Sequence, residues 1–201
     1  VMALGVACSI QANLGTSPIS SVPYALSQFT PLTVGTATIA MNAVFILIQI
    51  LLLRRRYDPV QLFQLPVAIV FGYLTDFAVW LVSFLQPAAY WQQWLLCLVG
   101  IALVGIGVSC EVTAGVATMA GEGVVLAVCQ VTPVKFGTMK VTFDVTLVVI
   151  ACTLSLLFLG HLAGVREGTV AAALLVGQVA RRMNRALEPV DRRLLTGYGD
   201  C

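Results

Sequence analysis

The sequence predicts an all-α polytopic membrane protein of two inverted-topology repeats, each with three transmembrane helices and one short broken or re-entrant helix. Three observations lead to this fold: the composition, the length of the apolar runs and an internal repeat. Hydrophobic residues make up 59% of the chain and charged residues 10%, whereas soluble domains carry roughly 25% charged residues. A soluble fold would leave too much apolar surface in water, so a bilayer is the predicted solvent.

The apolar runs are long and continuous. Val34–Leu53 and Trp94–Val108 contain no charged residue, and an α-helix needs about 20 residues to cross the hydrocarbon core. Outer-membrane barrel strands alternate apolar and polar residues over short segments. That class is therefore excluded, and we expect a multi-pass protein of the inner membrane.

The first half begins with an interrupted helix. Val1–Leu14 is predicted to be the distal part of a spanning helix, and we expect native sequence to precede it. Ser17 followed by Pro18 is a helix-start signal, with a capping hydroxyl and proline at the first helical position. The helix that they start is predicted to end near Phe29, before a Thr-Pro pair, and is too short to span the membrane.

Longer helices follow this short one. Residues 33–53 and 60–85 are each predicted to span the bilayer. Tyr90, Trp91 and Trp94 come next, and aromatic residues of this kind favour the membrane–water interface. A second set of spans is predicted beyond that interface.

The second half repeats the first after a shift of about 102 residues without a gap. Shared Thr-Pro and Gly-Thr pairs are hard to obtain by chance, and internal repeats recur in transporters. We therefore divide the single membrane domain into a first repeat (1–87), a second repeat (88–187) and a cytoplasmic tail (188–201). The aligned pairs are Gly5-Val6 with Gly107-Val108, Cys8 with Cys110, Thr16 with Thr118, Gln28 with Gln130, Thr30-Pro31 with Thr132-Pro133, and Gly35-Thr36 with Gly137-Thr138.

The distribution of basic residues predicts the topology. The repeat predicts a second short segment near Gly121–Val131, the partner of Ser17–Phe29. If both short segments enter and leave on the same side, six spans remain and the positive-inside rule is met, with only Arg166 outside. Eight spans would divide the basic residues between the two sides. Three spans per repeat is an odd number, so the halves are predicted to be inverted, with both termini in the cytoplasm. The residues then facing the cytoplasm are Arg54–Arg56, Lys135, Lys140, Arg181, Arg182, Arg185, Arg192 and Arg193.

Four acidic residues lie in apolar surroundings: Asp76, Glu111, Glu122 and Asp144. Charges inside a membrane are costly and usually face a cavity. Asp144 is spaced to form an i,i+4 salt bridge with Lys140, and a purely structural ion pair is an alternative to a binding role. For Glu122 the alternative is a cap at its helix start. Asp76 could be interfacial, and Glu111 could line the same cavity as Glu122.

The two breaks predict a binding site. A broken helix leaves free backbone N–H groups and a partial positive charge at its N-terminus, which must be buried in protein or line a wet cavity. Two breaks related by an in-plane pseudo-twofold axis would converge near the bilayer midplane, where such transporters bind substrate. Hydroxyls would contact the solute, and the acids would bind it or carry a coupled proton. The predicted substrate-binding residues are Thr16, Ser17, Ser20, Asn42, Glu122 and Asp144.

Other chemistry is not indicated. The six cysteines show no CxxC pairing or metal-ligand spacing, and His161 is predicted to lie in an outer loop. No HExxH or Ser/His/Asp set is present, so we expect neither an enzyme nor a bound metal or cofactor. Attraction to anionic lipid accounts for the basic tail, so no nucleic-acid binding is inferred.

The chain resembles the YczE/YyaS/YitT family of bacterial integral membrane proteins over nearly its whole length. Gln178 stands where the family pattern favours proline, and Ala120 stands where the first half has Pro18. The resemblance implies a bacterial membrane protein, with transport as an expectation, and names no substrate. The motifs that carry it are Leu14–Pro18, Leu32–Thr36, the Lys140–Asp144 helix, Gly164–Thr169 and Leu174–Gly177.

The leading functional hypothesis is a secondary transporter or facilitator of a small polar solute. One alternative is the substrate-binding membrane subunit of a multi-component importer, in which a small-residue face such as Ala3/Ala7 docks a partner helix. Another is an accessory or sensor membrane protein. The bilayer and the solute are the expected partners, and a homo-oligomer or a partner membrane subunit stays open.

Overall fold

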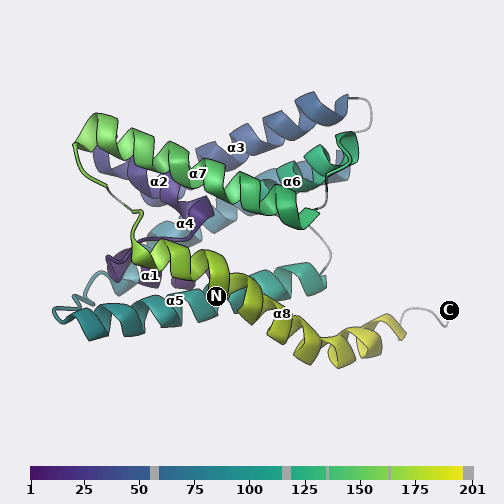
Figure 1. Cartoon of the computed structure of the whole chain (residues 1–201). Coiled ribbons are helices and arrows are strands. Elements are labelled where there is room, and N and C mark those ends of the chain that lie inside the picture. Colours follow the sequence, from purple (N-terminus) through teal and green to yellow (C-terminus); the bar gives the residue numbers. More distant parts are fainter. Residues whose placement is uncertain (55–58, 115–118, 135, 163, 197–201) are drawn as a thin grey trace.

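The computed structural model of the chain describes residues 1–54, 59–114, 119–134, 136–162 and 164–196. Within these ranges every regular element is a helix (Figure 1). The elements are α1 (Met2–Gln11), α2 (Pro18–Phe29), α3 (Val34–Leu53), a 3₁₀ turn (Pro59–Phe63), α4 (Gln64–Val82), α5 (Tyr90–Ala114), α6 (Ala120–Val131), α7 (Phe136–Leu159) and α8 (Glu167–Thr196).

Local sequence signals account for the helix boundaries of the first half. Pro18 occupies the first turn of α2, as predicted, and the extended Thr30 ends that helix. Thr33 caps α3, because its side-chain oxygen accepts a hydrogen bond from the Thr36 N–H at 3.1 Å. Ser17 differs from the prediction: it precedes α2, but its hydroxyl donates to Ser20 Oγ at 3.0 Å rather than capping the backbone.

Four helical segments in the described part of the chain are long and apolar enough to cross a membrane. They are Val34–Leu53, Gln61–Val82, Tyr90–Glu111 and Thr138–Leu159. The protein is thus an all-helical chain of the membrane type. The apolar helices Met2–Gln11 and Glu167–Val179 are shorter, so the count of six spans stays a prediction.

The helices of the two halves correspond in position and differ in direction. Helix α6 begins and ends 102 residues after α2. In Figure 1, α3 runs from left to right whereas α7 runs from right to left, and α4 and α8 also run in opposite directions. Helix α8 continues without a break past residues 187 and 188, so the predicted boundary of the tail falls inside a helix.

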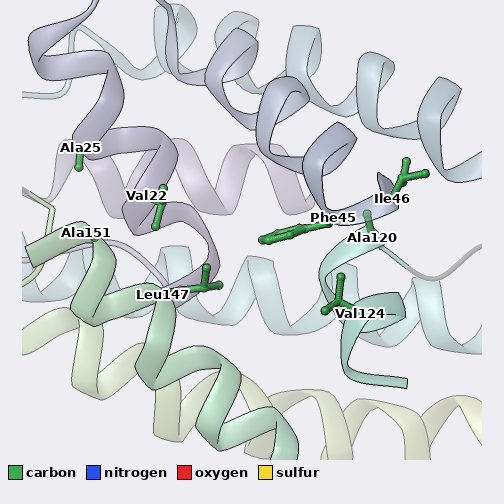
Figure 2. Packing of buried hydrophobic residues seen from close by; sticks show 8 residues of the cluster. All are labelled: Val22, Ala25, Phe45, Ile46, Ala120, Val124, Leu147 and Ala151. Atoms are coloured by element: carbon green, nitrogen blue, oxygen red, sulfur yellow. The ribbon is translucent and has the colours of Figure 1, made fainter. Parts of the chain in front are cut away.

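The helices pack in two groups, and each group takes two helices from each half. Helices α2, α3, α6 and α7 contact one another around a buried apolar cluster, which Figure 2 shows. Helices α1, α4, α5 and α8 form the other group, and an extensive contact between α3 and α4 joins the two groups. The cluster in Figure 2 consists of Val22, Ala25, Phe45, Ile46, Ala120, Val124, Leu147 and Ala151.

Small residues set the spacing of the second group. A Cβ atom added to Gly5 of α1 would lie 2.7 Å from the Val104 nitrogen and 2.8 Å from the Gly100 carbonyl oxygen of α5. Such close backbone approach is typical of helix pairs in membranes. The α1–α5 contact joins the two halves along the centre of this group.

Candidate functional site

A cavity of about 240 Å³ lies between the two helix groups. We call it the central cavity. Its walls come from the first turn of α2, from α5, α6, α7 and α8, and from the start of α1. Its lining residues are Met2, Ser17, Pro18, Ile19, Val104, Val108, Glu111, Met119, Glu122, Lys140, Val141, Asp144, Ala172, Ala173, Val176 and Gly177.

The starts of the two short helices meet at this cavity. Ser17 and Pro18 bring the N-terminal end of α2 to it, and Met119 and Glu122 bring the N-terminal end of α6. Ile19 and Gly121 are also close, because a Cβ on Gly121 would clash with the Ile19 side chain. The cavity wall therefore combines two helix N-termini, each with free N–H groups and a partial positive charge.

Charged side chains also reach the central cavity. Lys140 Nζ and Asp144 Oδ1 form a salt bridge of 3.1 Å, with side chains 29% and 24% exposed. Glu111 Oε1 accepts a hydrogen bond from the Met119 N–H, directly before α6. Glu122, in the first turn of α6, has no hydrogen bond or ion pair to any residue in the described ranges.

The carboxylate that accepts a hydrogen bond from the backbone at the start of α6 belongs to Glu111 of α5. Glu122 makes no such hydrogen bond within the described residues, although a negative charge in the first turn also favours the N-terminus of a helix. Among the described residues no group of three or more His, Cys, Asp or Glu side chains is close enough to hold a metal ion. Glu122 therefore presents to the cavity a carboxylate that no other described residue binds.

The predicted site residues fall into three places. Ser17, Glu122 and Asp144 line the central cavity together. Ser20 and Asn42 line an adjoining cavity of about 20 Å³, which shares Ser17 with the central one. The side chains of Ser20 and Asn42 are both buried. The Asn42 amide donates to the Thr38 carbonyl of its own helix at 2.9 Å.

Thr16 does not join this site. Its N–H and its hydroxyl donate to the Gly164 carbonyl at 2.9 Å and 3.3 Å. The N–H of Gly168 donates to the Leu14 carbonyl at 2.8 Å. The break between α1 and α2 is thus held against the loop before α8.

Asp76 also lies away from the cavity. It accepts hydrogen bonds from the Gly35 N–H at 2.7 Å and from the Thr33 hydroxyl at 2.6 Å. Asp76 therefore completes the N-terminus of α3, which is a structural role. His161 is exposed, and its Nδ1 lies 3.0 Å from the Leu159 carbonyl.

Sequence reasoning missed the α8 wall of the cavity and one buried amide. Ala172, Val176 and Gly177 carry no chemical signal that would separate them from other apolar residues. Gln49 is fully buried and donates to the Ala120 carbonyl at 2.9 Å and to Gln64 Oε1 at 3.2 Å. Its place inside an uncharged 20-residue run was the available signal, since buried polar groups need partners.

The model of a family of unknown function, DUF6198, matches residues 1–185. No curated protein and no solved structure matches the chain.

Proposed function

The chain belongs to DUF6198, a family of unknown function, and we propose that it is a secondary transporter or facilitator that carries a small polar solute across a bacterial inner membrane. The observation that carries this proposal is the central cavity. Charged residues of α5, α6 and α7 meet there at the N-terminal ends of two short helices. A relationship to the YczE/YyaS/YitT proteins is part of the proposal.

The charges argue for a wet path rather than a structural core. Each charge placed in the bilayer costs a few kcal/mol by insertion scales, so intramembrane charges are kept where they face water or a ligand. Lys140 and Asp144 neutralise each other, and Glu111 is bound to a backbone N–H. Glu122 is left to bind the solute or to carry a coupled proton.

The repeats supply the proposed mechanism. Helices α2 and α6 have matching bounds, and the long helices of the two halves run in opposite directions. These features support two inverted repeats with re-entrant α2 and α6, six spans and both termini in the cytoplasm. Because α3 and α4 remain in close contact across the two groups, rocking of the groups about that contact would then open the central cavity to either side in turn.

Solute uptake and proton movement, both measured in proteoliposomes, test this function. The protein would be reconstituted with a pH-sensitive dye inside the vesicles and challenged with a panel of small amines, carboxylates and polyols. One solute class is expected to drive proton movement in the wild type. The Glu122→Gln variant should fall to the level of protein-free vesicles, because an amide cannot exchange a proton.

Glu167→Gln is the matched control. Glu167 is an exposed carboxylate at the start of α8 and lines none of the cavities described here. Its variant should keep wild-type flux. Wild-type flux in Glu122→Gln would contradict the role of the carboxylate, and folded protein that moves no solute would favour the importer-subunit or sensor alternatives, for which copurification of a partner is the next measurement.

A further inference from the structure

A second cavity, of about 300 Å³, lies beside the loop that precedes α8. We call it the polar cavity. Its chemistry is set by Asn13, Thr16, Tyr24, Gln28, His161 and Arg166. Among the described lining residues Arg166 carries the only formal charge, and no carboxylate lines the cavity.

Arg166 is held in position with donors to spare. Its Nη1 donates to the Asn13 carbonyl at 3.0 Å, and its backbone N–H lies 3.3 Å from Thr169 Oγ1. A guanidinium has five N–H donors in a rigid fork, so one bond to a carbonyl leaves most of them available. A fork of this kind binds a carboxylate through two parallel hydrogen bonds.

The other polar groups of the cavity add donors rather than negative charge. The Tyr24 hydroxyl and the Gln28 amide have no hydrogen-bond partner within the described part of the chain. His161 Nδ1 faces the Leu159 carbonyl, and because a carbonyl only accepts, Nδ1 carries the proton. A volume at the small end of ligand pockets suits a small molecule.

The polar cavity is separate from the central cavity. Thr16 lines the polar cavity, whereas the next residue, Ser17, lines the central one. The extended backbone around Ser17 therefore forms a partition, and Thr16 fixes that partition to Gly164. A ligand in the polar cavity would not contact Glu122.

We propose that the polar cavity binds a small organic anion whose carboxylate pairs with the Arg166 guanidinium, and that Tyr24 and Gln28 donate to the rest of the molecule. This site goes beyond the proposed function and does not depend on it, because its readout is binding.

Thermal unfolding of the detergent-solubilised protein tests this site. The probes are acetate, succinate and citrate, with inorganic phosphate, sulfate and phosphatidylglycerol micelles as competing anions. At least one carboxylate should raise the unfolding temperature of the wild type and of Glu122→Gln. In Arg166→Gln the apparent affinity should fall at least about tenfold, through loss of a charge-assisted pair.

Two further variants make the outcome specific. Arg182→Gln removes an exposed arginine of α8 outside the cavity and should bind as the wild type does. Tyr24→Phe removes only a hydroxyl and should weaken binding about fivefold, the effect of one neutral hydrogen bond. If Arg166→Gln does not fold, the affinity of Tyr24→Phe for the carboxylate tests the site in its place.

Several results would overturn the site. Equal binding in Arg166→Gln and the wild type excludes the guanidinium as the anchor. A response to phosphate, sulfate or phosphatidylglycerol without a response to any carboxylate contradicts the ligand class. Loss of carboxylate binding in Glu122→Gln would place the anion in the central cavity instead.

Discussion

The α3–α4 pair and the α7–α8 pair occupy corresponding positions in the two predicted repeats. Helices α3 and α4 are in direct contact and form what we call the closed pair, whereas the central cavity separates α7 from α8, which we call the open pair. Gly35 and Gly72 let α3 and α4 touch backbone to backbone, and Asp76 of α4 bonds to the Gly35 N–H of α3. No comparable packing joins α7 and α8 in the described residues. Their facing side chains, Asp144 and Val176 among them, line the central cavity instead.

The sequence differs at the matching positions of the two pairs. A shift of 102 residues places Leu174 opposite Gly72 and Gln178 opposite Asp76. Leu174 is 63% exposed and therefore does not pack in the protein interior as Gly72 does, and a glutamine cannot supply a carboxylate like the one that Asp76 brings to the start of α3. The close α3–α4 contact thus depends on Gly72 and Asp76, which the second half lacks at the matching positions, whereas charged residues of the second half line the central cavity.

The contact between α3 and α4 can be disrupted by placing leucine, the residue of α8 at the matching position, in place of Gly72. We expect Gly72→Leu to destabilise the protein by about 3 kcal/mol, the upper part of the range for overpacking a tight contact. Even a Cβ atom at this position would lie 2.8 Å from the Gly35 carbonyl oxygen, and the side chain of Ile39 is closer still. Thermal unfolding in detergent measures the change.

Leu174→Ala is the control for that variant. Leu174 is 63% exposed, so truncation should change the free energy of unfolding by less than about 0.5 kcal/mol. Equal losses in the two variants would mean that the two helix pairs do not differ in packing.

The capping carboxylate of the closed pair gives the next largest effect. Asp76→Ala should cost about 2 kcal/mol, because it removes two hydrogen bonds to a charged group and leaves the N-terminus of α3 unsatisfied. Gln178→Ala, at the exposed matching position, should be nearly neutral. A loss in unfolding temperature no greater in Asp76→Ala than in Gln178→Ala would show that the carboxylate does not hold α3.

The Lys140–Asp144 ion pair of α7 should contribute least to the stability of the protein. Asp144→Asn is expected to change the free energy of unfolding by about 0.5 kcal/mol, as i,i+4 pairs with solvent access do. A double-mutant cycle with Lys140→Met isolates the pair energy. A coupling of several kcal/mol would make Lys140–Asp144 a structural ion pair in a dry core and would remove it from a wet path.

Residues that start and stop helices made the boundaries of the short helices predictable from sequence. Proline at the first position of α2 and the Thr-Pro pair after it set boundaries that agree with the structure to one residue. The repeat then predicted a second short helix near 121–131, and α6 spans Ala120–Val131. Sequence also brought Ser17, Glu122 and Asp144 together, because two broken helices in opposite orientations were expected to meet.

The remaining site residues depended on tertiary structure. Neighbouring side chains of an extended segment point to opposite sides, so Thr16 faces the polar cavity while Ser17 faces the central one. Asn42 bonds to the preceding turn of its own helix, an option open to any helical asparagine. The role of Asp76 required knowing that α4 lies against the start of α3.

Ligand-dependent thermal unfolding tests the central claim, that solute binds beside Glu122, most directly. A solute at about 100 times its dissociation constant should stabilise the wild type by about 2.7 kcal/mol. The account predicts that at least one small polar solute gives this shift in the wild type and in Glu167→Gln and gives none in Glu122→Gln. The claim is contradicted if every solute that stabilises the wild type stabilises Glu122→Gln to the same extent.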